Sequence, residues 1–510
     1  LLSRCRAWLV FQGYSQEVSI DCQQQFRLEG ANAGAWHFTA PCGQGQHVGF
    51  RLAAEMTAGK NRIRISAWRQ PAGGQSDRLA DDRPVKLIVR PDIDDRSFHE
   101  NTKAYLGPEH DWPKNCRPQE RGFTFTPGPD RVLRMTSSAG EFIREPEWQY
   151  MVHLPVEAER GMDPNTDLFS PGYFAVYVKG DDLVHFTAAV GPESEADDAS
   201  AESDLPSAES DKTAPLDTDF DTGLKNALKA YIVRRERLHT VIAGYPWFLD
   251  WGRDTLIVVR GLIAAGYLDE AETILMQFAA FEENGTLPNM IRGSDAGNRD
   301  TSDAPLWFFA ACADLTAAQK NQSLLNKDCG TGRTISDVLR SIAEGYIAGT
   351  PNGIRMDPES GLIYSPAHFT WMDTNHPAGS PRQGYPIEIQ ALWHFALSFL
   401  DRVDNQTDRM DRDWGAMARQ VNASIADLFA LPDRAWLSDC LHGDSATPAK
   451  EARADDALRP NQLFAVTLGA VTDKDRIEAM LRACMELLVP GAIRSLADRP
   501  VECPLPVWHE

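Results

Sequence analysis

The pattern of hydrophobic and polar positions changes its period near residue 220. Before this point, short runs of β-branched and aromatic residues are separated by Gly, Pro, Asn and Asp, which is typical of short antiparallel strands. The clearest predicted strands are 47–53, 61–68, 85–90 and 173–178. Regular short strands of this kind predict an antiparallel β-sandwich over residues 1–190. The segment RPDIDDR at 90–96 is expected to be an ordered loop, because it carries too many charges for a strand interior.

After residue 220 the hydrophobic residues recur with helical spacing. The predicted helices are 223–239, 254–265, 269–283, 304–320, 334–348, 387–402, 412–429, 460–469 and 473–488. Loops rich in tryptophan, aspartate and proline connect them, so we expect an α-helical toroid over 220–510 with a site at its mouth. A plain helical bundle fits the same periodicity.

Composition adds a third segment and limits the partners. Residues 191–219 contain ten acidic residues and one lysine, which predicts a disordered linker, with a binding tail as the alternative. The formal net charge of −22 and the lack of a basic stripe disfavour nucleic acid and membranes as partners. Nine scattered cysteines without metal-ligand spacing indicate reduced thiols, and we expect a cytoplasmic protein.

The densest group of chemically useful side chains is the segment YPWFLDWGRDT at 245–255. Trp251 offers a flat apolar face, and the adjacent Arg253 and Asp254 offer hydrogen-bonding groups, a combination that suits the apolar face and hydroxyl rim of a sugar. The alternative is a helix start, with Asp250 as N-cap and Asp254 as an acid in the first turn. The residue types alone leave both interpretations open.

Two further loops repeat this mixture of tryptophan and carboxylate. Asp303 and Trp307 either join the site or belong to the start of the helix predicted from Ala304. Asp373 directly follows Trp371 and a methionine, and an apolar wall favours the protonated carboxyl that a general acid needs near neutral pH. An aspartate that merely starts a turn is the alternative.

Two more loops contribute arginines and amides. Glu388 interrupts an apolar helix start and is expected to face inward with Arg382 as its partner, unless the two form a purely structural ion pair. The loop 458–464 adds an arginine and two amides. The sequence contains no phosphate-binding glycine loop, nucleophile elbow or metal motif, so carbohydrate hydrolysis by a carboxylate pair is favoured.

These motifs resemble those of the amylo-α-1,6-glucosidase family, the glucosidase half of glycogen debranching enzymes. The matching stretches are AGYPWFLDWGRDTLIVVRGL (243–262), GTLPNMIR (285–292), DTSDAPLWF (300–308), TWMD (370–373), SPRQGYPIEIQALW (380–393) and RPNQLFAVTL (459–468). Residues 90–109 and 145–174 also resemble the β-sandwich partner domain of the family.

The resemblance implies an (α/α)6 barrel, the six-hairpin glycosidase fold, with no metal or organic cofactor. It also implies hydrolysis, with inversion, of α-1,6-linked glucose at the branch points of glycogen or limit dextrin. By its motif Asp373 is expected to be the general acid, and Asp254 is expected to bind sugar hydroxyls in the first subsite. The other candidates for this pocket are Trp251, Arg253, Asp303, Trp307, Trp371, Arg382 and Glu388.

The sequence departs from the family at its C-terminus. Family members have a Tyr-His-Gln-Gly motif followed by Trp, which in eukaryotes contains the catalytic base, whereas this chain ends at Glu510 without it. The predicted helices are also too few to close the barrel, and the chain begins at Leu1. We therefore expect a fragment that lacks the last helices and the base, with Glu388 as an alternative base. Other possibilities are a phosphorylase or another α-glucosidase on the same barrel, and a glycogen-binding fragment without catalysis.

Overall fold

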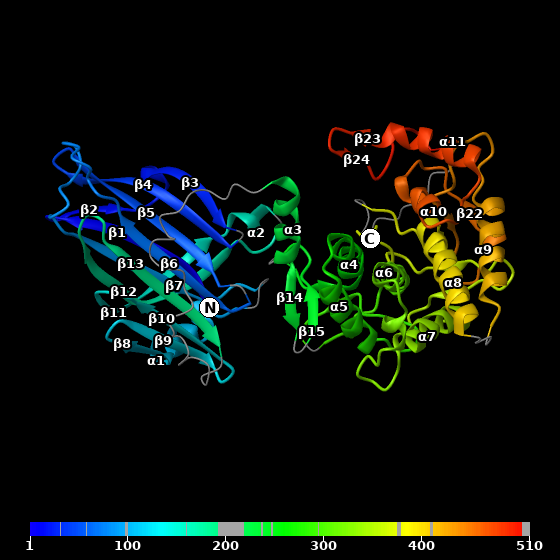
Figure 1. Ribbon diagram of the computed structural model, residues 1–510, viewed down its shortest axis with the longest axis horizontal. Helices are drawn as coiled ribbons and strands as arrows, with labels where there is room; N and C mark the ends of the chain where they lie inside the picture. The colour runs from blue at the N-terminus through cyan, green and yellow to red at the C-terminus, as the bar shows by residue number, and fades with distance from the viewer. Residues whose placement is uncertain are drawn as a thin grey trace. The chain divides into compact units, whose positions relative to one another are not determined.

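The computed structural model of the protein describes residues 1–30, 32–57, 59–96, 100–159, 161–191, 219–235, 238–245, 248–293, 295–374, 379–407 and 412–501. The chain forms two compact units, Leu1–Asn226 and Ala227–Glu510 (Figure 1). The linker predicted over 191–219 lies outside the described residues, except for its two end residues.

The first unit contains two antiparallel sheets in its described part (Figure 1). The five-stranded sheet has the order β11-β12-β7-β1-β2, with β1 Leu2–Phe11, β2 Tyr14–Glu17, β7 Val85–Ile93, β11 Glu141–His153 and β12 Asn165–Val178. The eight-stranded sheet has the order β3-β4-β5-β6-β13-β10-β9-β8, with β3 Gln23–Gly30, β4 Ala33–Gly43, β5 Gln46–Met56, β6 Arg62–Arg69, β8 Cys116–Gln119, β9 Gly122–Gly128, β10 Arg131–Ser137 and β13 Leu183–Gly191. Two short helices, α1 (Pro108–Asn115) and α2 (Pro155–Glu159), lie in the connections.

One hydrophobic core joins the two sheets. Phe174 of β12 and Phe186 of β13 pack edge to face with their ring centroids 5.3 Å apart, so side chains from both sheets meet. Phe50 of β5 and Leu87 of β7 are fully buried in the same core. The predicted sheet-rich first domain is confirmed, and each of the predicted strands overlaps an observed one.

The prediction of a loop over 90–96 is wrong for its first residues, because β7 continues through Ile93. Asp92 is completely buried in this strand, yet its charge is compensated from the neighbouring β1. Arg6 donates two hydrogen bonds to Asp92, at 2.9 and 2.8 Å, and Arg4 donates a third at 2.6 Å. Paired charges are tolerated in a strand interior where single charges are not.

The second unit is mainly helical. Its helices are α4 Gly252–Ala265, α5 Leu268–Ala280, α6 Ala304–Gln319, α7 Ile335–Ala348, α8 Ile387–Thr407, α9 Trp414–Leu428, α10 Leu463–Thr467 and α11 Lys474–Cys484, and α3 (Phe220–Ala230) runs across the boundary between the units. Short strands occupy the connections: β14 Ile232–Arg235, β15 Leu238–Val241, β16 Asp250–Trp251, β17 Met290–Ile291, β18 Arg355–Met356, β19 Ile363–Tyr364, β20 Gly384–Pro386, β21 Cys440–His442, β22 Arg453–Ala454, β23 Leu488–Val489 and β24 Ala492–Ile493.

The helix predicted over 223–239 is wrong in its second half. The chain leaves the helical conformation after Ala230, and β14 and β15 pair as an antiparallel hairpin. The β-branched residues of these two strands favour an extended backbone, which explains the difference. The helix predicted over 460–469 is also shorter than expected, because Pro460 begins a 3-10 turn that precedes α10.

Helix α6 lies at the centre of this unit, where it contacts α4, α5 and α8. Its residues from Ala304 to Cys312 are all buried, so this helix is hydrophobic on every side rather than along one stripe. The helix begins beside the loops that carry the candidate site. In the described part of the chain, none of the helices has the length and apolar character needed to cross a bilayer.

Candidate active site

A pocket of about 540 Å³ lies at the N-terminal end of α4. It is lined by Ala243, Phe248, Trp251, Arg253, Asp254, Ile257, Val258, Trp371 and Asp373. The first part of this lining comes from the turn into α4, which is held by the pairing of Trp251 in β16 with Met290 in β17. The second part comes from the loop that precedes β20. The fold thus brings together two motifs that are more than a hundred residues apart in the sequence.

Arg253 connects these two motifs. Its Nε donates to Asp303 Oδ2 at 2.6 Å, and its Nη1 donates to Asp373 Oδ2 at 3.2 Å. Burial opposes the charge of Arg253, but the two carboxylates outweigh this effect and raise its pKa. The side chain is only 7% exposed, and its Nη2 has no hydrogen-bond partner in the described part of the chain.

Asp254 lies in the first turn of α4 and lines the pocket at the same time. Burial raises the pKa of this carboxyl, Arg253 opposes the rise, and the charges of Asp303 and Asp373 add to it. Asp250 is not the N-cap that one interpretation expected. The cap is Trp251, and Asp250 instead accepts two hydrogen bonds of 2.7 Å from Arg235.

Asp303 and Trp307 lie behind the pocket rather than in its lining. Asp303 precedes α6, but its carboxylate does not cap the helix, because it accepts hydrogen bonds from Arg253 and from Thr301 Oγ1, the latter at 2.8 Å. Trp307 is 4% exposed and packs edge to face against Phe464, with 5.4 Å between ring centroids. Both residues therefore pack behind the side chains that line the pocket.

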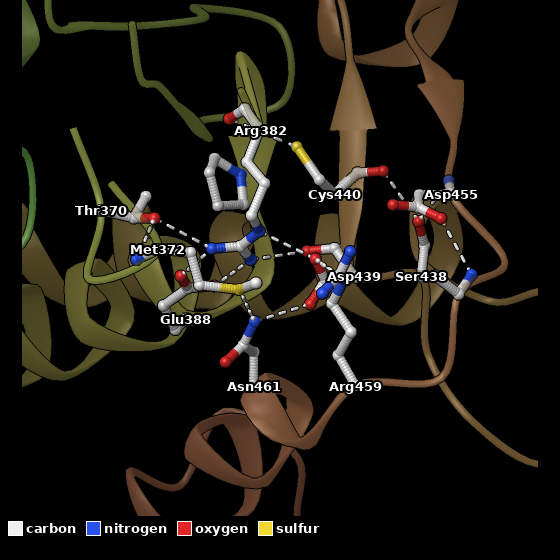
Figure 2. A network of polar contacts seen from close by, with 12 residues as sticks. Thr370, Met372, Arg382, Glu388, Ser438, Asp439, Cys440, Asp455, Arg459 and Asn461 are labelled. Atoms are coloured by element: carbon white, nitrogen blue, oxygen red, sulfur yellow. Dashed lines mark hydrogen bonds and ion pairs between the residues drawn. The ribbon is translucent and has the colours of Figure 1, made fainter. Parts of the chain in front are cut away.

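Arg382 and Glu388 form a closed ion pair beneath the loop that carries Asp373 (Figure 2). Both oxygens of Glu388 accept hydrogen bonds from Arg382, and Arg382 Nε donates to Asp439 Oδ2 at 2.8 Å. Burial raises the pKa of Glu388, an effect that Arg382 opposes. Glu388 is 2% exposed, so it has no access to a water molecule in the pocket. This geometry fits the structural ion pair rather than a base.

The backbone of Arg382 is strained, with a φ of 49° in the left-handed region. Such a conformation costs a non-glycine residue roughly 1–3 kcal/mol. The guanidinium compensates through its bonds to Glu388 and Asp439 and through a 3.0 Å bond to Thr370 Oγ1. The network thus holds the start of the Trp371–Asp373 segment in place.

Sequence reasoning missed two groups of residues. The first is the apolar lining of the pocket, where Phe248 and Ile257 remain 42% and 41% exposed. Phe248 lies within the motif at 245–255, and Ile257 follows it by two residues, so their signal was a large apolar side chain in or next to this motif. The second is Asp439, which is completely surrounded by protein. Its only signal was a carboxylate next to the apolar residues Cys440 and Leu441. Among the residues that the structure describes, no cluster of His, Cys, Asp and Glu could hold a metal ion.

Two family models match the chain. Residues 226–502 match the family model described as amylo-alpha-1,6-glucosidase, and residues 1–185 match the one described as glycogen debranching enzyme N terminal. The glycogen debranching enzyme of Saccharomyces cerevisiae is 25% identical over 233 residues, which are 34% of this chain and 15% of the yeast protein. The chain therefore matches only a small part of that relative.

Two solved structures share the fold at low sequence identity. A bacterial glucoamylase complexed with acarbose superposes with a TM-score of 0.50 at 12% identity, over 95% of this chain and 72% of the other. A kojibiose phosphorylase from the human microbiome, described as putative in its title, superposes with a TM-score of 0.51 at 9% identity, over 93% and 69%. Because the family model spans more than half of the residues and includes all the pocket motifs, the chain belongs to the amylo-alpha-1,6-glucosidase family.

Proposed function

We propose that this protein is a glycoside hydrolase that releases glucose from the α-1,6 branch points of glycogen or limit dextrin. The observation that carries the proposal is the pocket itself, in which Asp254 and Asp373 lie beside the indoles of Trp251 and Trp371. An aromatic ring packs against the apolar face of a glucose ring, and a carboxylate accepts hydrogen bonds from its hydroxyl groups. A volume of about 540 Å³ is within the range of sites that enclose small ligands.

Asp373 is assigned as the general acid. Its side chain is 42% exposed, so a glycosidic oxygen can approach it, whereas the buried Asp303 cannot be reached in this way. The acid protonates the leaving oxygen while a base activates water on the opposite face of the sugar, which inverts the anomeric centre. The two carboxyl groups of such an enzyme stand about 6.5–9.5 Å apart to admit the water.

The remaining residues of the pocket are assigned to sugar binding. Asp254 accepts hydrogen bonds from sugar hydroxyls. Trp251 and Trp371 cover the apolar faces of the ring. Four residues do not line the pocket and instead hold the residues that line it in position. They are Asp303, Trp307, Arg382 and Glu388.

The test is Asp373→Asn in the intact protein. We expect release of glucose from branched limit dextrin to fall at least about a hundredfold, because a general acid contributes roughly 10²–10⁴-fold. The matched control is Asp269→Asn, an exposed aspartate in the first turn of α5. Both variants should keep the circular dichroism spectrum and melting temperature of the wild type. Turnover by Asp373→Asn at the rate of the control would refute the assignment.

A phosphorylase is the second candidate. It is favoured by the fold that this chain shares with a protein named as a kojibiose phosphorylase. The products decide between the two reactions. A hydrolase forms glucose whether or not inorganic phosphate is present, whereas a phosphorylase forms glucose 1-phosphate and needs phosphate.

A further inference from the structure

Of the hydrogen bonds that attach the segment Thr370–Asp373 to the rest of the unit, two involve Thr370 and Trp371. Two more join Arg253 Nη1 to Asp373 at 3.2 Å and Asn461 Nδ2 to the sulfur of Met372 at 3.5 Å. Thr370 Oγ1 accepts a hydrogen bond of 3.0 Å from Arg382 Nη1. One residue later, the indole N–H of Trp371 donates to Asn461 Oδ1 at 2.9 Å. The attachments of Thr370 and Trp371 approach from different parts of the chain, since Arg382 precedes β20 and Asn461 belongs to the turn before α10.

Both attachments end on the same carboxylate (Figure 2). Asp439 Oδ2 accepts from Arg382 Nε at 2.8 Å, and Asp439 Oδ1 accepts from Asn461 Nδ2 at 2.8 Å. The exposed fractions are 2% for Asp439 and 1% for Asn461. Neither side chain can touch a substrate in the pocket. Any effect that they have on the reaction must therefore pass through the residues that they hold.

Trp371 is placed to transmit such an effect. Its side chain lines the pocket and is 39% exposed, while its N–H is bonded to the buried Asn461. An indole that is free at one side can turn about its side-chain torsions, and a single hydrogen bond at the N–H selects one orientation. The amide of Asn461 is itself kept in place by Asp439.

We propose that Asn461, oriented by Asp439, is a positioning residue that fixes the ring of Trp371 and, through it, the place of Asp373 in the pocket. The inference rests on the proposed function only for the reaction that the kinetic assay measures. It differs from a merely structural role of Asn461, in which loss of the side chain would lower stability without a specific change at residues 368–374.

The experiment compares Asn461→Ala with Asn422→Ala in the intact protein. Asn422 of α9 is the control, because its amide donates a partly buried hydrogen bond, to the carbonyl oxygen of Ala470 at 2.6 Å, outside the network of Asp439. Hydrogen exchange over 368–374, the melting temperature, and kcat and KM on branched limit dextrin are measured for each. We expect Asn461→Ala to speed exchange at 368–374 and to lower kcat/KM by about ten- to a hundredfold, mainly through kcat, because small misplacements of catalytic groups have effects of this size. Asn422→Ala should lower the melting temperature without either change.

A second background tests the route through Trp371. Trp371→Phe keeps an aromatic ring but removes the N–H, so Asn461 has lost its bond to the ring before it is replaced. Asn461→Ala should then have a much smaller effect on exchange and on kcat/KM than in the wild type. Equal effects in both backgrounds, or an Asn461→Ala that behaves like Asn422→Ala, would overturn the proposal. Hydrogen exchange requires no turnover, so a wild-type protein that releases no glucose would refute the proposed function and leave this inference to be decided by exchange.

Discussion

Replacement of Arg382 by methionine should be among the most destabilising single changes in the helical unit. The side chain is completely buried, and its guanidinium donates to both oxygens of Glu388, to Asp439 and to Thr370. Methionine leaves the buried Glu388 without its cation and leaves the buried Asp439 with only Arg459, whose Nε lies 3.5 Å from Asp439 Oδ2. Breaking one buried ion pair costs about 3–5 kcal/mol, and whole domains are stable by only about 5–15 kcal/mol. We therefore expect a loss of at least about 4 kcal/mol.

The assay is urea unfolding followed by tryptophan fluorescence. Arg412→Met is the control, since Arg412 forms an ion pair with Glu344 in which both side chains are about 40% exposed or more, and it should lose no more than about 1 kcal/mol. If Arg382→Met does not fold, the double variant Arg382→Met/Glu388→Gln should recover part of the loss, because it removes the buried charge that has lost its cation. A loss below 1 kcal/mol, or a double variant less stable than Arg382→Met, would show that uncompensated charge is not what the network prevents.

Two further predictions concern the start of α4. Burial raises the pKa of Asp254, so its ionised form weakens the fold, and this penalty is absent at a pH below the ordinary value of about 3.8. Asp254→Asn should therefore raise the melting temperature at pH 7, lose this gain near pH 3, and weaken the binding of a glucan oligosaccharide; a gain that is independent of pH would contradict the assignment. Gly252→Ala should cost about 1–3 kcal/mol in urea unfolding, because a Cβ atom would lie 2.3 Å from the carbonyl oxygen of Pro288. Gly261→Ala in the same helix meets nothing within 4 Å and should gain about 0.5–1 kcal/mol, so equal effects of the two changes would refute the packing argument.

Periodicity predicted most of the helical unit because its helices have strong apolar repeats. The helices predicted at 254–265 and 334–348 agree with α4 and α7 to within two residues at each end. Two of the failures depend on contacts between segments. The hairpin of β14 and β15 depends on pairing between strands, and the end of β7 depends on arginines of β1.

The same distinction holds for the pocket. Trp251, Arg253 and Asp254 could be named because they are close together in sequence at the start of a helix. Trp371 and Asp373 could be named because they too are close together in sequence. The position of Arg382 and Glu388 outside the lining could not be predicted, since their burial depends on Asp439, a residue 57 positions away from Arg382. Residue types predict which side chains could take part in a reaction, whereas burial decides which of these side chains can contact a ligand.

The network around Asp439 also has a consequence for folding during synthesis. It joins residues 370, 382, 439 and 461, so its last member is made about ninety residues after its first. On a ribosome that adds roughly 5–20 residues per second, the Trp371 segment waits several seconds for its anchor. During this interval an indole and several charged groups lack their final partners. Rare codons between 382 and 461 should therefore lower the yield of active protein.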